Sequence, residues 1–141
     1  MTGSTAPTRR AVLQGASAAV VAGVALTACG DASDGGGATS TGPAKAGPVG
    51  KSADVPVGGG TVFASSNVVV TQPTSGDFKG FNTRCTHQGC AVSSVADGYI
   101  ICPCHNSRFA VGDGAPTADS MAKEPLASVP VSVANGEITV A

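Results

Sequence analysis

The feature that most constrains this 141-residue chain is a pair of short segments that hold both of its histidines and four of its five cysteines. They are "CTHQGC", residues 85–90, and "CPCHNS", residues 102–107. The stretch between them, "AVSSVADGYII", contains the dipeptide Asp97-Gly98, a strong signal for a two-residue β-hairpin turn. Such a hairpin folds the chain back on itself, so we expect the two segments to lie side by side.

If each segment contributes one cysteine and one histidine, the two segments together make a four-ligand metal site. The four candidate ligands are Cys85, His87, Cys102 and His105. Two cysteines and two histidines suit a tetrahedral structural zinc ion, which is one reading of the pattern. Zinc, however, gives no role to the additional Cys90 and Cys104, one in each segment. In an oxidising compartment these two could bond to each other and fasten the segments together.

The two segments together closely resemble the Rieske iron–sulfur domain, whose 2Fe–2S centre has two histidines on one of its irons. The resemblance implies that the cofactor is one 2Fe–2S cluster. It implies that Cys85 and Cys102 bind one iron, and that the other iron is held by His87 and His105. The fold that the resemblance implies is all-β: a Rieske-type fold of small antiparallel sheets, with the cluster held by two loops at one end.

The resemblance extends to residues around the ligands. It implies that Cys90 and Cys104 are the disulfide pair of the family, and that Ser107 donates a hydrogen bond to a bridging sulfide. Phe109 stands where high-potential members often have a tyrosine. Residues 120–122, "SMA", stand where the covering loop of the family typically has Gly-Pro-Ala. Met121 there is either a shield for the cluster or an ordinary loop methionine.

The sequence pattern after residue 54 independently favours an all-β domain. Short β-branched runs such as "TVF", "NVVVT", "FKGFNT", "YIIC", "VPVSV" and "EITV" are separated by turn signals. Asn135-Gly136 predicts a second tight hairpin between two of these runs. Only residues 117–124, "TADSMAKE", could form a helical turn or two. The resemblance to the Rieske domain runs over the same part of the chain, residues 54–141.

The first 28 residues have the layout of an export signal. Arg9 and Arg10 precede an apolar, small-residue stretch, a pattern typical of secretory signals. The paired arginines resemble a twin-arginine signal, and "LTAC" resembles a bacterial lipobox, which implies that Cys29 carries lipid. An uncleaved N-terminal helix is the minor alternative, because eighteen weakly apolar residues are barely enough to span a membrane.

Residues 29–53 are rich in Gly, Ser, Thr, Ala and Pro and nearly free of large apolar side chains. Such a composition cannot bury enough surface to offset chain entropy, so it predicts a flexible linker behind the lipidated Cys29. The domain is then expected outside the cell, on the outer face of the cytoplasmic membrane. The formal net charge is −1 and no basic stripe is present, which argues against nucleic acid as a partner.

The function implied is that of a membrane-tethered electron carrier with no catalytic site of its own, serving as a subunit or partner of a respiratory oxidoreductase such as a quinol–cytochrome c reductase. Its partner is then a membrane-bound electron donor or acceptor. Two alternatives stay open at this point: the small iron–sulfur subunit of a periplasmic oxidase, as in arsenite oxidation, and a zinc-stabilised surface binding domain. A Rieske oxygenase needs two further histidines for a second iron, and both histidines here are already used. Cytoplasmic Rieske ferredoxins fit less well because they lack the extra cysteine pair.

Overall fold

The computed structural model describes residues 42–141, which contain ten β-strands and two short 3-10 helices. The strands are β1 Gly47–Lys51, β2 Gly59–Phe63, β3 Val68–Thr74, β4 Asp77–Asn82, β5 Ser94–Ala96, β6 Tyr99–Cys102, β7 Ser107–Ala110, β8 Ser128–Val129, β9 Val131–Ala134 and β10 Glu137–Val140. The 3-10 helices are η1 Ser52–Asp54 and η2 Ala64–Ser66. The expected all-β class is confirmed. Within the part of the chain that the structure describes, no helix is long and apolar enough to cross a membrane.

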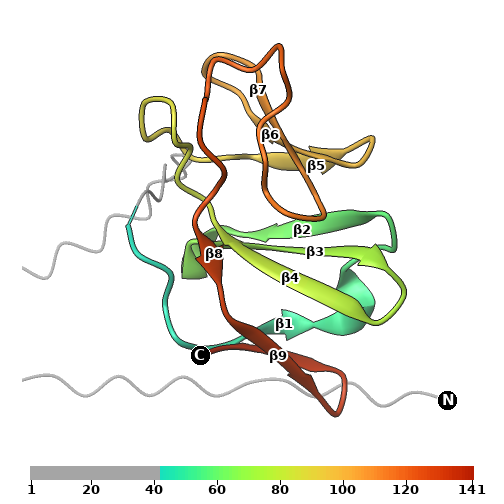
Figure 1. The fold of residues 1–141 in the computed structure, drawn as a ribbon. Helices are drawn as coiled ribbons and strands as arrows, with labels where there is room; N and C mark the ends of the chain where they lie inside the picture. Colours follow the sequence, from blue (N-terminus) through green and yellow to red (C-terminus); the bar gives the residue numbers. More distant parts are fainter. Residues whose placement is uncertain (1–41) are drawn as a thin grey trace, which may run out of the picture. The chain divides into compact units, whose positions relative to one another are not determined.

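The strands form three small antiparallel sheets. The central sheet has the order β2-β3-β4-β8, a second has the order β1-β10-β9, and a third contains β5-β6-β7. In Figure 1 the third sheet lies above the central one, and β1 and β9 lie below it. The third sheet and the loops beside it carry both cysteine–histidine segments, so the candidate site lies at one end of the domain.

Two hairpin turns predicted from the sequence are present. Asp97 and Gly98 join β5 to β6 with φ angles of 51° and 79°. Asn135 and Gly136 join β9 to β10 with φ angles of 52° and 78°. Positive φ at both central positions is the backbone requirement of a two-residue hairpin whose twist matches that of its strands. The first of these turns brings the two cysteine–histidine segments back to the same end of the third sheet, as expected.

Strand β3 has three consecutive valines because both of its faces are buried. Successive side chains of a strand point to opposite faces. Val69 packs into the core that contains the free cysteines, whereas Val68 and Val70 pack into a second core that includes Ile138 of β10. A central strand with a core on each face therefore needs apolar residues at consecutive positions.

The predicted linker over residues 29–53 is wrong at its C-terminal end. Strand β1 lies inside that range and pairs with β10, with Gly47 opposite Val140. Composition suggested a spacer because glycine-rich sequence buries little. Here the backbone supplies the ladder hydrogen bonds, and Gly50 leaves space for the ring of Phe63, which occupies the position of a Cβ. The ordered domain therefore begins before residue 54, while residues 1–41, with Cys29 and the predicted signal, lie outside the described residues.

Two further segments differ from the expectation. Residues 107–110 form β7, which the sequence pattern did not single out. Residues 117–124 form a single turn, closed by a 3.0 Å hydrogen bond from the Ser120 amide to the Thr117 carbonyl, rather than a helix. Ser120 joins these two segments. Its hydroxyl accepts from the Arg108 amide and donates to the Arg108 carbonyl, both at 2.8 Å, which fastens this segment alongside β7.

Candidate metal centre

The first site loop, residues 85–90, follows β4 and turns tightly on itself. The Cys85 amide donates to the Cys90 carbonyl at 2.7 Å, and the Gly89 amide donates back to the Cys85 carbonyl at 2.9 Å. Gly89 has a φ of 76°, a conformation that residues with a side chain rarely adopt. Glycine at this position therefore allows the tight turn of the loop.

The second site loop, residues 102–107, is the connection between β6 and β7. Cys102 is the last residue of β6 and is paired with Ser107, the first residue of β7. The four residues between them are all exposed. The loop is therefore anchored at its two buried ends and presents its middle to the solvent, with Asn106 at a φ of 52° turning the chain back.

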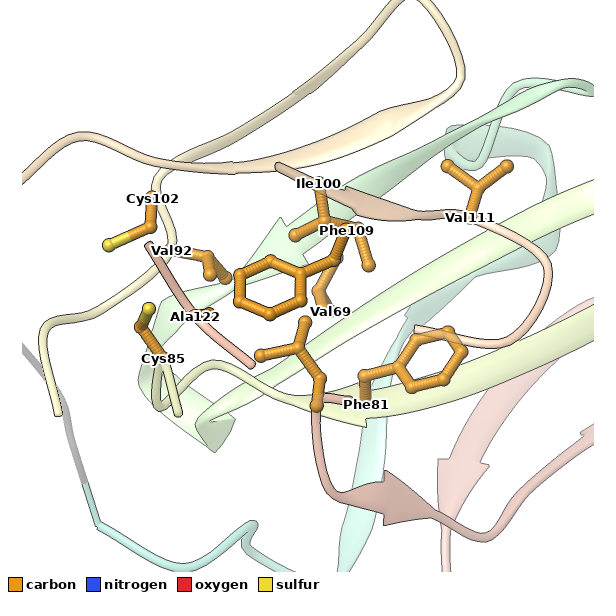
Figure 2. Packing of buried hydrophobic residues seen from close by; sticks show 10 residues of the cluster. Val69, Phe81, Cys85, Val92, Ile100, Cys102, Phe109, Val111 and Ala122 are labelled. Carbon is orange, nitrogen blue, oxygen red and sulfur yellow. The ribbon is translucent and has the colours of Figure 1, made fainter. Parts of the chain in front are cut away.

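The two free thiols lie at the end of the upper core. Cys85 and Cys102 are 2 % and 1 % exposed, and Figure 2 shows both sulfur atoms at the margin of the apolar cluster, beyond Val92 and Ala122. Burial raises the pKa of the Cys102 thiol above its ordinary value; the backbone amide of Cys104 opposes the shift, and the hydrogen-bonded Cys85 thiol adds to it. A nearby metal cation would favour the deprotonated form of such a buried thiol, which is the form that binds metals.

The two imidazoles also meet. The ring centroids of His87 and His105 are 4.6 Å apart, with an interplanar angle of 82°. His105 is exposed and His87 is half-buried. Nδ1 of His87 is a buried nitrogen without a hydrogen-bond partner among the described residues. An orphaned buried nitrogen costs free energy unless a ligand satisfies it, so this atom is suited to bind a metal.

The structure therefore places the two predicted thiol ligands beside each other and the two predicted imidazole ligands beside each other, and each pair has one member from each loop. This arrangement fits a diiron cluster that is held unequally, with both thiols on one iron and both imidazoles on the other. A single tetrahedral ion would instead need all four donors around one point. The donor set and its pairing thus fit the 2Fe–2S cluster.

Cys90 and Cys104 form a disulfide, with Cα atoms 6.6 Å apart. This disulfide links the first site loop to the second. The sulfur of Cys102 lies beside it, because the three sulfur atoms are all within 4.8 Å of one another. The trio is not itself a metal site, since disulfide sulfurs carry no thiolate charge, and only Cys102 among them is free.

Removing the disulfide should leave the cluster in place but make it less durable. A Cys90→Ser, Cys104→Ser double variant loses a cross-link that closes a loop of about fifteen residues, which corresponds to about 3 kcal/mol or less. We expect the visible spectrum to persist, while the cluster bleaches faster in urea than in the wild type. Equal bleaching rates in the two proteins would show that the cross-link contributes nothing to the stability of the site.

A third loop, residues 117–126, fastens both site loops. The Ala122 amide donates to Ser107 Oγ at 3.3 Å, and Thr86 Oγ1 donates to the Glu124 carbonyl at 2.7 Å. Ala122 and Leu126 of this loop pack into the core, at 1 % and 3 % exposed, whereas Met121 is 56 % exposed. Sequence reasoning missed Thr86 because its partner lies 38 residues away, and no local pattern indicates that contact.

Comparison with known proteins identifies the family. The sequence profile of the Rieske [2Fe-2S] domain matches residues 45–130, and the chain belongs to this family. The match begins within ten residues of the first described position, in agreement with the inclusion of β1 in the domain. The family's domain binds one 2Fe–2S cluster, which is accordingly the cofactor of this chain and replaces the zinc reading.

Two curated relatives represent different settings for the domain. A Haloferax mediterranei protein provisionally named the respiratory nitrate reductase subunit Rieske is 33% identical over 72 residues, which cover 51% of this chain and 33% of that protein. The chain thus matches only a third of that relative's length. The 3-phenylpropionate/cinnamic acid dioxygenase ferredoxin subunit of Escherichia coli is 32% identical over 89 residues, covering 61% of this chain and 83% of the ferredoxin.

Solved structures give the same fold. The ferredoxin of carbazole 1,9a-dioxygenase from Nocardioides aromaticivorans superposes with a TM-score of 0.52 at 27% identity, covering 69% of this chain and 97% of the ferredoxin. The plasma membrane Rieske protein of the cyanobacterium Synechocystis gives 0.50 at 26% identity, covering 67% and 97% of the two chains. The chain is therefore a Rieske-type iron–sulfur electron-transfer protein.

Proposed function

We propose that this protein is an exported, lipid-anchored electron carrier that serves a respiratory oxidoreductase as a subunit or partner. The geometry that carries the proposal is the pairing of two buried thiols with two imidazoles, one of which is exposed. The export-type N-terminal sequence supports a location outside the cell. A disulfide between the site loops is also typical of proteins that work in oxidising compartments. The Haloferax relative provides a respiratory precedent.

The ligand assignment follows from the two like pairs. Cys85 and Cys102 would hold one iron, and His87 and His105 would hold the other. Two ferric ions, two sulfides and two thiolates sum to zero net charge, whereas a cluster with four thiolates carries two negative charges. An electron enters a neutral centre more readily, so the reduction potential lies high, within about −150 to +300 mV. The bound cluster supplies one-electron storage, and the remaining contributions come from the protein.

Electrons enter and leave at the exposed end of the domain. His105 lies in the exposed middle of its loop, whereas both thiols are buried. A redox partner that docks on this end therefore contacts the imidazole edge before any other ligand. The exposed Met121 belongs to the third loop, which is hydrogen-bonded to both site loops, so we include it in the proposed docking surface. The protein's own part in electron transfer is to orient these groups and to keep water from the thiols.

Ser107 is proposed to tune the potential. Its side chain is fully buried, and its oxygen accepts from the Ala122 amide, which leaves the hydroxyl proton available for a sulfur atom of the cluster. Hydrogen bonds to the sulfurs stabilise the more negative, reduced state. Phe109 is also fully buried and has no hydroxyl to make a second such bond. We therefore place the potential in the upper half of the range, below that of members with both donors.

Ser107→Ala should lower the reduction potential without removing the cluster. A hydrogen bond to a charged group contributes about 1.5–3 kcal/mol, which for one electron corresponds to about 60–130 mV. A spectroscopic redox titration of both proteins measures the difference. Ser107→Thr, which keeps the hydroxyl, is the matched control and should retain most of the wild-type potential. A potential in Ser107→Ala equal to that of the wild type would exclude a hydrogen bond from this hydroxyl to the cluster.

The membrane anchor is tested by Cys29→Ala. Without the lipidated cysteine, the protein should move from the membrane to the soluble fraction while its cluster spectrum stays unchanged. Respiratory membranes that reduce the wild-type cluster should reduce the variant more slowly, because tethering raises the effective concentration of the partner. Crosslinking with the native anchor in place then captures the partner. A variant that remains in the membrane fraction contradicts the anchor at Cys29.

A ferredoxin that delivers electrons to an oxygenase is the second candidate function. The observation that favours it is the 83% coverage of the E. coli dioxygenase ferredoxin subunit. The disulfide argues against it, since disulfides rarely persist in the cytosol. The small subunit of a periplasmic oxidase, as in arsenite oxidation, is compatible with the same disulfide. The captured partner distinguishes the three: a respiratory complex, a soluble oxygenase or a periplasmic oxidase.

A further inference from the structure

The free thiol of Cys102 lies next to a disulfide. The sulfur atoms of Cys90, Cys102 and Cys104 are all within 4.8 Å of one another, and only Cys102 is unpaired among the three. Once it is deprotonated, a thiol in contact with a disulfide can begin thiol–disulfide exchange. The same sulfur is, under the function proposed above, an iron ligand. One atom therefore has two competing bonding partners within the folded site.

We propose that the cluster must be inserted before the Cys90–Cys104 disulfide forms, because in a cluster-free chain Cys102 exchanges with that disulfide and is lost as a ligand. The inference rests on the proposed role of Cys102 in binding iron. Cluster insertion and disulfide formation must then occur in a fixed order. A reducing compartment delivers iron and sulfide to a chain with four thiols, and an oxidising compartment closes the disulfide afterwards.

The exchange needs no external oxidant or reductant. The thiolate sulfur of Cys102 attacks Sγ of Cys90, a new bond forms between these two sulfurs, and the Cys90–Cys104 bond breaks. The bonding electrons leave with Cys104, whose thiolate takes up the proton that Cys102 gave up to the solvent. One disulfide and one thiol are present on both sides, so the step balances.

Cys90 is the favoured point of attack because of the leaving group. Cys104 is exposed, so its departing thiolate is solvated, whereas Cys90 is half-buried. Attack on Cys104 would instead bond Cys102 to a residue only two positions away, across the rigid ring of Pro103. Reactive distance requires the sulfurs to approach by about 1–2 Å. The exposed middle of the second site loop can supply this movement.

Two cluster-free proteins test the proposal. The first is the full-length wild type, stripped of its cluster at low pH, where exchange is halted because thiolates are absent, and then returned to pH 8 without oxygen or reductant. The second is Cys85→Ser, which lacks one ligand and leaves a single unpaired sulfur among the three. Samples are quenched over time with N-ethylmaleimide, reduced, treated with iodoacetamide and digested with trypsin. Tandem mass spectrometry of the peptide 85–108 then reads which cysteine was free.

The proposal predicts that the maleimide label moves from Cys102 to Cys104 in both proteins until Cys104 carries most of it. The movement should be faster in native buffer than in urea, because the fold holds the three sulfurs together. A label that stays on Cys102, or a movement no faster in native buffer than in urea, overturns the proposal.

Cys102→Ser is the matched control, and its disulfide should stay between Cys90 and Cys104 throughout. Cluster uptake gives a second readout. The exchanged wild-type chain should accept iron and sulfide only after treatment with a dithiol reductant, and uptake without reductant contradicts the proposed order. The labelling experiment involves neither a redox partner nor a membrane, so its failure is distinguishable from a failure of the proposed respiratory function.

Discussion

Replacing His105 with alanine should abolish the paramagnetic signal of the reduced protein. The exposed imidazole of His105 lies 4.6 Å from that of His87, and together they form the proposed nitrogen side of the site. Without this imidazole, an iron would lack one ligand on an exposed loop. The measurement is electron paramagnetic resonance after dithionite reduction, together with iron and sulfide content per chain.

His105→Cys separates ligand loss from change of charge. A thiolate restores a fourth ligand but adds one negative charge, so any cluster that assembles should have a lower reduction potential. The expected direction is toward the roughly −400 mV of clusters with four thiolates. Gln88→Ala, an exposed neighbour in the first site loop, is the matched control and should keep the wild-type spectrum. A wild-type spectrum in His105→Ala would remove this histidine from the ligand set.

Phe109→Ala should destabilise the domain by about 3–5 kcal/mol, the usual cost of removing a buried aromatic ring. Phe109 is fully buried, and Figure 2 shows its ring at the centre of the cluster between Val69, Val92 and Ala122. Domains of this size are stable by only about 5–15 kcal/mol, so the loss is large. Unfolding in urea, followed by circular dichroism and by the visible absorbance of the cluster, measures it.

Two comparisons make the result specific. Phe109→Leu keeps most of the buried volume and should lose less than about 1.5 kcal/mol, because volume-conserving swaps are tolerated best. Val57→Ala removes apolar atoms from a residue that is 60 % exposed, so its effect should stay within about 0.5 kcal/mol. If Phe109→Ala unfolded at the same urea concentration as Val57→Ala, the ring could not be a central part of the core.

The sequence was sufficient to predict the parts of the fold that depend on neighbouring residues. Asp97-Gly98 and Asn135-Gly136 form the predicted hairpins because positive φ is a local requirement that few residue types meet. The two site loops follow from the first of these hairpins. The pairing of Cys90 with Cys104 in the structure also agrees with the resemblance.

The parts of the fold that the sequence could not predict are held by residues far away in the chain. Strand β1 is ordered by its pairing with β10, and Gly50 is required by the ring of Phe63. Composition alone therefore suggested a linker. The third loop is held by Thr86 and by Ser120, whose hydrogen-bond partners lie 38 and 12 residues away. Short polar side chains that bond to distant backbone groups leave no periodic pattern in a sequence.

The central claim is that two thiols and two imidazoles divide unequally over a diiron core. Its most direct test is the metal and sulfide content of the purified folded chain, joined to the electron paramagnetic resonance spectrum after dithionite reduction. The account predicts two irons and two acid-labile sulfides per chain, with a paramagnetic signal that appears on reduction. A colourless protein that contains one zinc ion and shows no signal after anaerobic reduction would contradict it.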